Sequence, residues 1–138
     1  SKIMFGAYNK RIKNVRTSND WLTRDETVVD EYNAGKLTTF LFTVNGYRGL
    51  MNMILYVRKP RNIAKIPKNL PMLMVSGLDD PVGEYGKGVY RAYNTYHGHI
   101  DDIDLRLFED CRHELCNELN KEEIYEEIYG WIVDHMNK

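Results

Sequence analysis

The sequence predicts an α/β fold with a parallel sheet, on three observations. Residues 70–75 form a short continuous apolar run, which is typical of a buried strand. Residues 103–108 alternate apolar and polar side chains, as a second strand does. Apolar side chains at helical spacing follow each strand, over 82–96 and again after residue 120. The order strand, helix, strand, helix implies parallel pairing through right-handed crossovers.

Each boundary in this part of the chain has a local signal. Ser76 and Gly77 follow the first strand and favour a turn. Asn120 stands three residues before Glu123, which resembles a capping box at the start of the last helix. The apolar stripe of that helix consists of Ile124, Ile128, Trp131, Ile132 and Met136. Two parallel strands make a poor sheet, so we expect part of this sheet to lie outside the chain.

Residues 1–59 differ in composition and predict short helices joined by turns. This part is rich in Asn, Thr, Tyr and Met. One helix opens at residues 23–26 and stops at Gly35, and a second covers residues 47–57. The composition changes near Pro60. We therefore expect two regions, residues 1–59 and residues 60–138.

Composition and charge exclude several classes of protein. A hydrophobic fraction of 43% is too high for intrinsic disorder, and 2 cysteines are too few for a disulfide scaffold. With 19 Lys and Arg against 20 Asp and Glu, the net charge of −1 argues against nucleic acid as a partner. No apolar run approaches the roughly 18 residues of a membrane-spanning helix. We expect both cysteines to be reduced and partly buried, which agrees with a cytoplasmic location.

Chemically competent side chains follow both predicted strands. Asp79 and Asp80 come after the first strand, and His113 comes after the second, 33 residues beyond Asp80. Because the carboxyl ends of parallel strands share one edge, an acid and a histidine would meet there. A buried carboxylate can then fix the imidazole tautomer and stabilise its protonated form. The alternative is that Asp80 only caps the helix before Pro81 and that His113 is an ordinary loop residue.

Two of these loops also resemble a known family. Residues 70–83 resemble the acid-bearing strand and turn of α/β-hydrolases of the lysophospholipase, monoacylglycerol-lipase and serine aminopeptidase S33 type. Residues 112–118 are similar to the histidine loop of the same family. Further matches are residues 85–89, the closing helix with Tyr125, Ile128 and Trp131, and upstream Arg16-Thr17, residues 20–25 and Phe42-Thr43. The resemblance thus covers nearly the whole chain.

The resemblance implies a fold and a function. Residues 1–59 would be the helical cap and residues 60–138 the C-terminal part of the hydrolase core. Asp80 would be the acid of a Ser-His-Asp triad and His113 its base, with Asp79 as a competitor for the acid. The substrate would be a small lipid ester, such as a lysophospholipid or a monoacylglycerol, reached through transient contact with a membrane surface. The reaction would need no metal and no organic cofactor.

One departure from the family pattern concerns the nucleophile. The nucleophilic serine of these enzymes precedes the acid and lies in a Gly-x-Ser-x-Gly turn. The sequence has no such motif, and its serines are Ser1, Ser18 and Ser76. The oxyanion-hole loop of the early strands is missing as well. We therefore expect the C-terminal portion of a longer hydrolase, whose nucleophile lies before Ser1 and without which this chain is inactive.

Other motifs predict less. His113-Glu114 begins a near match to a zinc-protease motif, but Asn117 stands where the second histidine belongs. Gly83, Gly86 and Gly88 reverse the order of a dinucleotide fingerprint, so flexible backbone beside Asp80 is the simpler interpretation. A group of methionines and aromatic residues could form either ordinary core or the wall of an acyl-chain pocket. Such residues more often form core. The group comprises Met51, Met53, Met72, Met74, Trp21, Phe40 and Phe42.

A non-enzymatic role is the main alternative. The chain would then be a binding or interaction module, and the open flank of the first strand would favour self-association. Within the enzyme class, the alternative to an esterase is a peptidase of the same fold.

Overall fold

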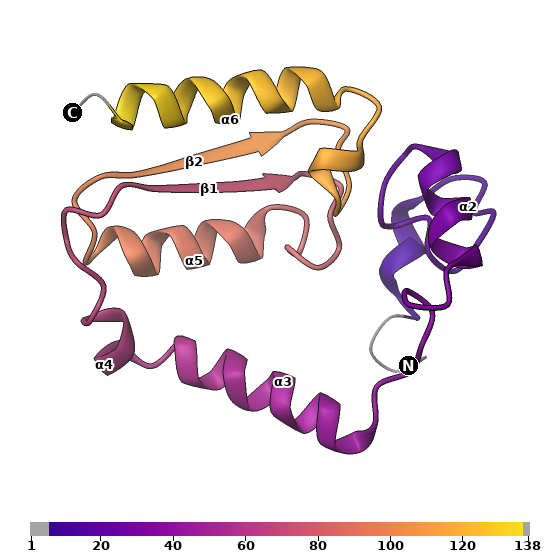
Figure 1. Ribbon diagram of the computed structural model, residues 1–138, viewed down its shortest axis with the longest axis horizontal. Helices are drawn as coiled ribbons and strands as arrows, with labels where there is room; N and C mark the ends of the chain where they lie inside the picture. Colours follow the sequence, from indigo (N-terminus) through magenta and orange to yellow (C-terminus); the bar gives the residue numbers. More distant parts are fainter. Residues whose placement is uncertain (1–5, 137–138) are drawn as a thin grey trace.

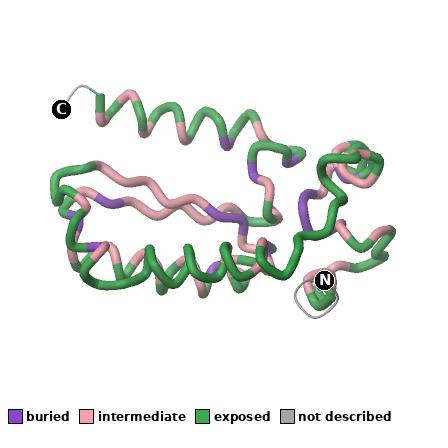
Figure 2. The backbone as a smooth tube through the Cα atoms, turned by 60° about the horizontal axis from the view of Figure 1, so that its bottom comes forward, coloured by how far each residue is buried: buried purple, intermediate pink, exposed green. Residues whose placement is uncertain are grey.

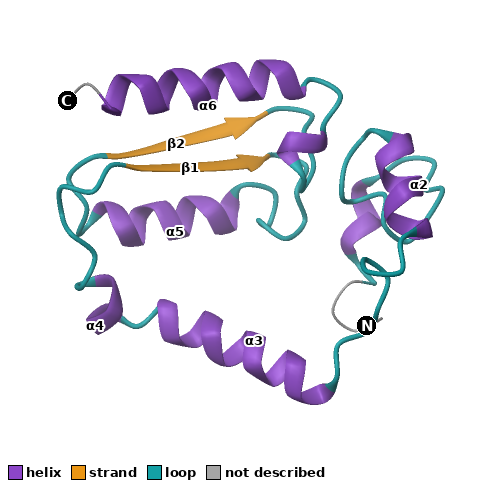
Figure 3. Ribbon diagram, in the orientation of Figure 1, coloured by secondary structure: helices purple, strands orange, loops and turns teal. Residues whose placement is uncertain are grey.

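The computed structural model describes residues 6–136 as a small α/β layer with a helical region beside it (Figure 1). Strands β1 (Met72–Gly77) and β2 (Ile103–Phe108) lie between helix α5 (Lys87–His97) on one side and helix α6 (Lys121–Met136) on the other (Figure 3). The carboxyl ends of both strands point toward the region that holds η1 (Tyr8–Arg11) and α2 (Glu26–Ala34). The predicted α/β class is confirmed.

The two strands pair in parallel, as predicted. Met72 is in register with Ile103, and Gly77 with Phe108. Strand β2 has the predicted limits, whereas β1 begins two residues later than predicted and runs on through Ser76 and Gly77. Ser76 and Gly77 still pair with Leu107 and Phe108, so they extend the strand instead of turning it.

Helix α5 begins at Lys87, five residues after the predicted start at Val82. The side-chain carboxylate of Asp80 accepts a hydrogen bond from the Val82 backbone N–H. The backbone carbonyl of Asp80 accepts one from the Tyr85 backbone N–H. Gly86, which caps the helix, has a φ of +82°, in the left-handed region that favours glycine. The segment between Asp80 and the helix is therefore a turn built around the acid, which the apolar spacing alone did not predict.

Helix α6 closes the small core at the carboxyl end of the sheet. Cys111, Leu115 and Ile124 are buried, and partly buried Val75, Phe108 and Ile128 pack against them. The 3-10 turn η2 (Leu115–Asn117) leads into α6. Asn120 and Glu123 contact each other as the predicted capping box suggests, but the bond joins their side chains: the Asn120 amide donates to the Glu123 carboxylate. A capping box pairs each side chain with a backbone N–H instead.

The first part of the chain contains α2, α3 (Val44–Val57) and the short α4 (Pro60–Ile63). Asp25 caps α2 by accepting from the Thr27 and Val28 backbones, and Gly35 ends it as predicted. Helix α3 starts three residues before the predicted start, because the Thr43 side chain caps it by accepting from Gly46. Among residues 6–136, no helix combines the length and the apolarity needed to cross a membrane.

The expectation that the methionines and cap aromatics form core is wrong for four of them. Met51, Met53, Phe40 and Phe42 are exposed. Trp21 is buried, and Met72 and Met74 are partly buried. Met72 and Met74 lie on β1, which α5 covers on one side, whereas α3 lies apart from the sheet (Figure 1).

Gly77 lies at a close approach between the two loops that follow the strands. A Cβ atom at this position would overlap the carbonyl oxygens of Cys111 and Arg112. The next two backbone amides, of Leu78 and Asp79, donate to the carbonyls of Phe108 and Cys111, both at 2.9 Å. The missing side chain thus lets the two loops share backbone hydrogen bonds.

We predict that Gly77→Ala lowers the free energy of unfolding by about 2–3 kcal/mol, because the added methyl group forces the loops apart. Gly49→Ala is the matched control. Gly49 lies inside α3 with no atom within 4 Å of an added Cβ, so alanine should raise the stability by up to about 1 kcal/mol. Urea unfolding of both variants measures the difference, and equal stabilities would contradict the close contact.

Candidate active site

Asp80 is a buried acid held by the turn that follows β1. Its side chain is 8% exposed. Oδ1 accepts from the Val82 backbone N–H at 2.8 Å, and the Asp80 backbone N–H donates to the Gly77 carbonyl at 3.3 Å. Asp79, the competing acid, is exposed. The turn thus fixes Oδ1 of Asp80, while Oδ2 makes no hydrogen bond within the turn and can contact a group outside it.

The structure brings Asp80 and His113 together at the carboxyl edge of the sheet. Oδ2 of Asp80 lies 3.1 Å from Nδ1 of His113. The hydrogen bond with this carboxylate raises the pKa of His113, an effect that burial of the ring opposes in part. Because Nδ1 faces the acid, Nε2 on the opposite side of the ring remains for a reacting group. The pair has the geometry of a base oriented by an acid.

The segment around Trp21 holds the histidine loop from the other side. The Glu114 backbone N–H donates to the Leu22 carbonyl at 2.7 Å, and the His113 backbone N–H donates to the Trp21 carbonyl at 3.4 Å. The Trp21 ring, itself buried, lies 5.1 Å from the His113 ring, measured between centroids. The imidazole is therefore positioned by the acid on one side and by an indole on the other.

A buried carboxylate joins these two segments. Glu118 is fully buried, and its Oε1 accepts from the Arg112 backbone N–H at 2.7 Å. Its Oε2 accepts from Nε of Arg24 at 2.8 Å, an ion pair across 94 residues of sequence. An unpaired charge would be costly there, so Arg24 fixes where residues 20–24 lie relative to the histidine loop.

Arg112 connects the same two segments a second time, with its side chain reaching from the histidine loop to residues 20–23. Its Nη1 donates to the carbonyl oxygens of Asp20 at 2.7 Å and Thr23 at 2.9 Å. The Thr23 hydroxyl in turn donates to the Asn117 carbonyl at 2.7 Å. We call Arg24, Arg112 and Glu118 the clamp. Sequence reasoning did not single out these three as anchors, because their partners lie far apart along the chain.

A cavity of about 790 Å³ lies in the first part of the chain, and its lining does not include His113 itself. Trp21 lines it and also contacts the His113 ring, so the cavity and the candidate base share a side chain. The rest of its wall has apolar or aromatic side chains, Tyr32, Leu37, Phe40, Leu41, Phe42 and Tyr47, together with polar ones, Asn9, Ser18, Asn19, Asn33, Thr38 and Thr39. The exposed Phe40 and Phe42 thus line a cavity instead of a packed core.

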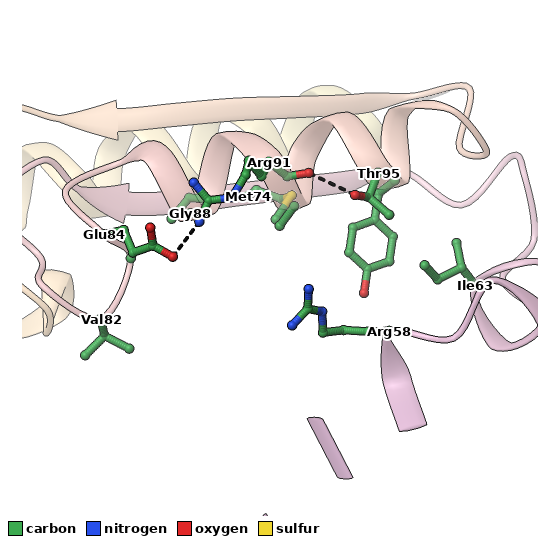
Figure 4. Close-up of a pocket in the computed structure, with 12 residues that line it drawn as sticks. Arg58, Ile63, Met74, Val82, Glu84, Gly88, Arg91 and Thr95 are labelled. Atoms are coloured by element: carbon green, nitrogen blue, oxygen red, sulfur yellow. Dashed lines mark hydrogen bonds and ion pairs between the residues drawn. The ribbon is translucent and has the colours of Figure 1, made fainter. Parts of the chain in front are cut away.

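A second cavity, of about 750 Å³, lies between α4 and α5 and does not include the acid or the histidine (Figure 4). Arg58 and Ile63 line one side, and Arg91 on α5 lines the other. Arg91 is paired with Glu84, as the dashed line in Figure 4 marks. This cavity, with a mixed polar and apolar lining, is separate from the candidate site.

The alternative motifs take ordinary structural roles. The Asn117 side chain donates to the Glu114 carboxylate at 2.8 Å, and residues 6–136 contain no cluster of three or more His, Cys, Asp or Glu side chains suited to a metal. Gly83 accepts from the Gly88 backbone at 2.9 Å within the turn around Asp80. Both cysteines are free, but only Cys111 is buried, so the expectation of partial burial is wrong for the exposed Cys116.

Comparison with known proteins places the chain in a family and gives two similar structures. Residues 2–120 match the family model of serine aminopeptidase, S33. The chain is similar to a highly thermostable carboxyl esterase from Bacillus coagulans in complex with glycerol, with a TM-score of 0.81, 24% identity, and coverage of 99% of this chain and 44% of that one. It is also similar to a lipase in its open form, with a TM-score of 0.79, 24% identity, and coverage of 97% and 44%. A search of curated proteins found no match. The chain spans less than half the length of both structures.

We predict that Glu118→Gln lowers the free energy of unfolding by about 3 kcal/mol, because the buried pair with Arg24 loses its negative charge. Glu127→Gln is the matched control. Glu127 pairs with Arg106 at 2.9 Å, but both side chains are more than 40% exposed, so this change should cost less than about 1 kcal/mol. Thermal or urea unfolding compares the two. Equal losses would show that the clamp contributes no more than a surface ion pair.

Proposed function

The chain belongs to the serine aminopeptidase S33 family of α/β-hydrolases, and on that premise we propose that it supplies the acid and the base of a Ser-His-Asp triad. The Asp80–His113 hydrogen bond of 3.1 Å carries the proposal, since it gives the order and roles of a triad acid and base. The nucleophilic serine would come from the longer protein, so we expect this chain alone to be inactive.

The proposed reaction is hydrolysis of a carboxylic ester. The serine hydroxyl attacks the ester carbonyl while Nε2 of His113 accepts its proton. His113 then gives that proton to the departing alcohol, and water releases the acid from the acyl-enzyme by the same steps. Asp80 holds Nδ1–H and stabilises the imidazolium ion that forms. These steps require no metal and no organic cofactor.

The proposed substrates are small lipid esters, such as monoacylglycerols or lysophospholipids. Residues 1–59 would act as the cap over the site, and the cavity beside Trp21 would hold the acyl chain. Its volume of about 790 Å³ lies within the range of ligand pockets, and its wall includes apolar and aromatic side chains. Because both cysteines are free, we place the protein in the cytoplasm.

A peptidase is the second candidate, favoured by the aminopeptidase description of the matching family. Both reactions use the same triad. Comparison of kcat/KM for monoacylglycerols and for aminoacyl peptides, measured on the same preparation, separates the two, since only a peptidase cleaves the amide.

A serine-reactive fluorophosphonate tests the proposed function in the longer protein from its native source. We expect labelling of a polypeptide about twice the mass of this chain, and His113→Ala should abolish the label and lower kcat by roughly a thousandfold. His97→Ala is the control, because His97 is an exposed histidine on α5. The proposal fails if the native protein is an unlabelled polypeptide of 16.2 kDa.

The pKa of His113 gives a second test, accessible in the chain itself. Asp80→Asn removes the carboxylate that raises this pKa, so it should fall toward or below the ordinary histidine value of about 6.5. Asp79→Asn is the control and should change it little, because Asp79 is exposed. Nuclear magnetic resonance titration of the His113 ring protons measures the pKa.

The raised pKa of His113 predicts how the rate of ester hydrolysis by the longer protein depends on pH. A protonated imidazole cannot accept the serine proton, so ester hydrolysis should decline as pH falls through the raised pKa of His113. A decline centred at the same pH in the Asp80→Asn variant would show that another group controls the rate.

A further inference from the structure

The turn that follows Asp80 has an unusual backbone. In residues 80–86, which we call the acid turn, Glu84 has a φ of 52° and Tyr85 has a φ of 57°. Both values lie in the left-handed region, which is unfavourable for residues with a side chain and most of all for bulky ones. Such a conformation persists only where the surrounding structure holds it, and it is found most often at functional sites. The backbone of Tyr85 therefore needs a physical cause.

Hydrogen bonds within the acid turn supply part of that cause. The Tyr85 backbone N–H donates to the Asp80 carbonyl at 2.8 Å, and the Glu84 backbone N–H donates to the Pro81 carbonyl at 3.2 Å. The Glu84 carboxylate also pairs with Arg91 on α5. These contacts hold the backbone of the turn and the side chain of Glu84, whereas the ring of Tyr85 contacts a distant part of the chain.

The Tyr85 ring is covered by Arg11, the last residue of η1. The guanidinium carbon Cζ of Arg11 lies 3.6 Å from the centre of the ring. A guanidinium over an aromatic face at this distance makes a favourable cation–π contact. Within residues 6–136, Arg11 forms no ion pair that would compete for its guanidinium. The ring contact thus joins η1 to the acid turn.

The first residue of η1 reaches toward the histidine. The Tyr8 ring packs edge-on against the Trp21 ring, with 5.0 Å between centroids and an angle of 74° between planes. Trp21 in turn contacts the His113 ring. Residues 20–23 are buried, whereas η1 contains no buried residue (Figure 2). One short element therefore contacts the acid turn with Arg11 and, through Trp21, supports the histidine with Tyr8.

We propose that Arg11 and Tyr85 are positioning residues that set the geometry of the Asp80–His113 pair. Their contact holds the acid turn against the same element that supports Trp21, so that Oδ2 of Asp80 stays within hydrogen-bond distance of Nδ1 of His113. They act through the acid and the base and not on a substrate. Their importance for catalysis rests on the proposed function, whereas their effect on the hydrogen bond does not.

A purely electrostatic role for Arg11 makes the opposite prediction. Asp80 and Glu114 are the charged groups that act on the His113 ring, and both raise its pKa. A nearby cation disfavours protonation, so the loss of the Arg11 charge alone would raise this pKa further. Loss of position would lower the pKa instead, because the Asp80 carboxylate would be held less closely. The sign of the change thus separates the two roles.

Nuclear magnetic resonance titration of the 138-residue chain measures that sign. Arg11 is exposed, so Arg11→Gln leaves the core intact. We expect it to lower the pKa of His113 to a value between those of the unmodified chain and Asp80→Asn. Lys10→Gln is the matched control, because it removes the same charge from the neighbouring exposed residue of η1. This control should leave the pKa unchanged or raise it slightly.

Variants of Tyr85 test the other side of the contact. Tyr85→Leu removes the ring and should lower the pKa of His113 as Arg11→Gln does, whereas Tyr85→Phe keeps the ring face and should preserve it. Tyr85→Asn also removes the ring, but asparagine tolerates left-handed backbone, so this variant should lower the pKa without added strain. Because both side chains act through one contact, Arg11→Gln with Tyr85→Leu should lower the pKa no further than the larger single change.

Kinetics of the longer protein give a second readout. Arg11→Gln should lower kcat for a monoacylglycerol by roughly three- to tenfold and leave KM nearly unchanged, because it alters the alignment of acid and base and not the binding of substrate. Lys10→Gln should change neither constant.

Two results would overturn the proposal. A pKa of His113 that rises equally in Arg11→Gln and Lys10→Gln would show that Arg11 acts by charge alone. An unchanged pKa in both Tyr85→Leu and Tyr85→Asn would show that the ring does not position the acid. Neither result affects the proposed hydrolase function, which fails instead if the native protein is not labelled by the fluorophosphonate.

Discussion

The fully buried carboxylate of Glu118 is the constraint on which the arrangement of this chain depends. A charge without access to water must find its partners within the protein. Here it finds Arg24 and the Arg112 backbone, which come from two segments far apart in the sequence. Once these are joined, the Trp21 ring lies beside the His113 ring, and Gly77 lets the acid turn approach the same loop. The distance between Asp80 and His113 therefore follows from contacts outside the pair.

Sequence predicted the elements better than the contacts between them. Strand β2 was predicted with the correct limits, because its alternation is a local property, and parallel pairing followed from the order of elements. The start of α5 was wrong because Asp80 holds the preceding backbone in a turn. The acid and histidine could be predicted as neighbours from the sheet edge alone, whereas the clamp depends on contacts across more than 85 residues.

The exposed apolar side chains show a second limit of sequence reasoning. Helical spacing predicts that a face is covered, but it does not say by what. Met53 satisfies this pattern and Phe40 does not lie in a helix, yet both are exposed in this chain, which spans less than half the length of the two similar structures. Phe40 lines the cavity beside Trp21, whereas Met53 lies on α3, so the two side chains are exposed in different settings.

The central claim is that Asp80 fixes the imidazole of His113 for proton transfer at Nε2. The ¹⁵N chemical shifts of the His113 ring, measured above its pKa, test this most directly because they identify which nitrogen carries the proton. We predict that the neutral ring carries it on Nδ1 and that Asp80→Asn produces a mixture of tautomers. A ring protonated on Nε2 in the unmodified chain would contradict the account.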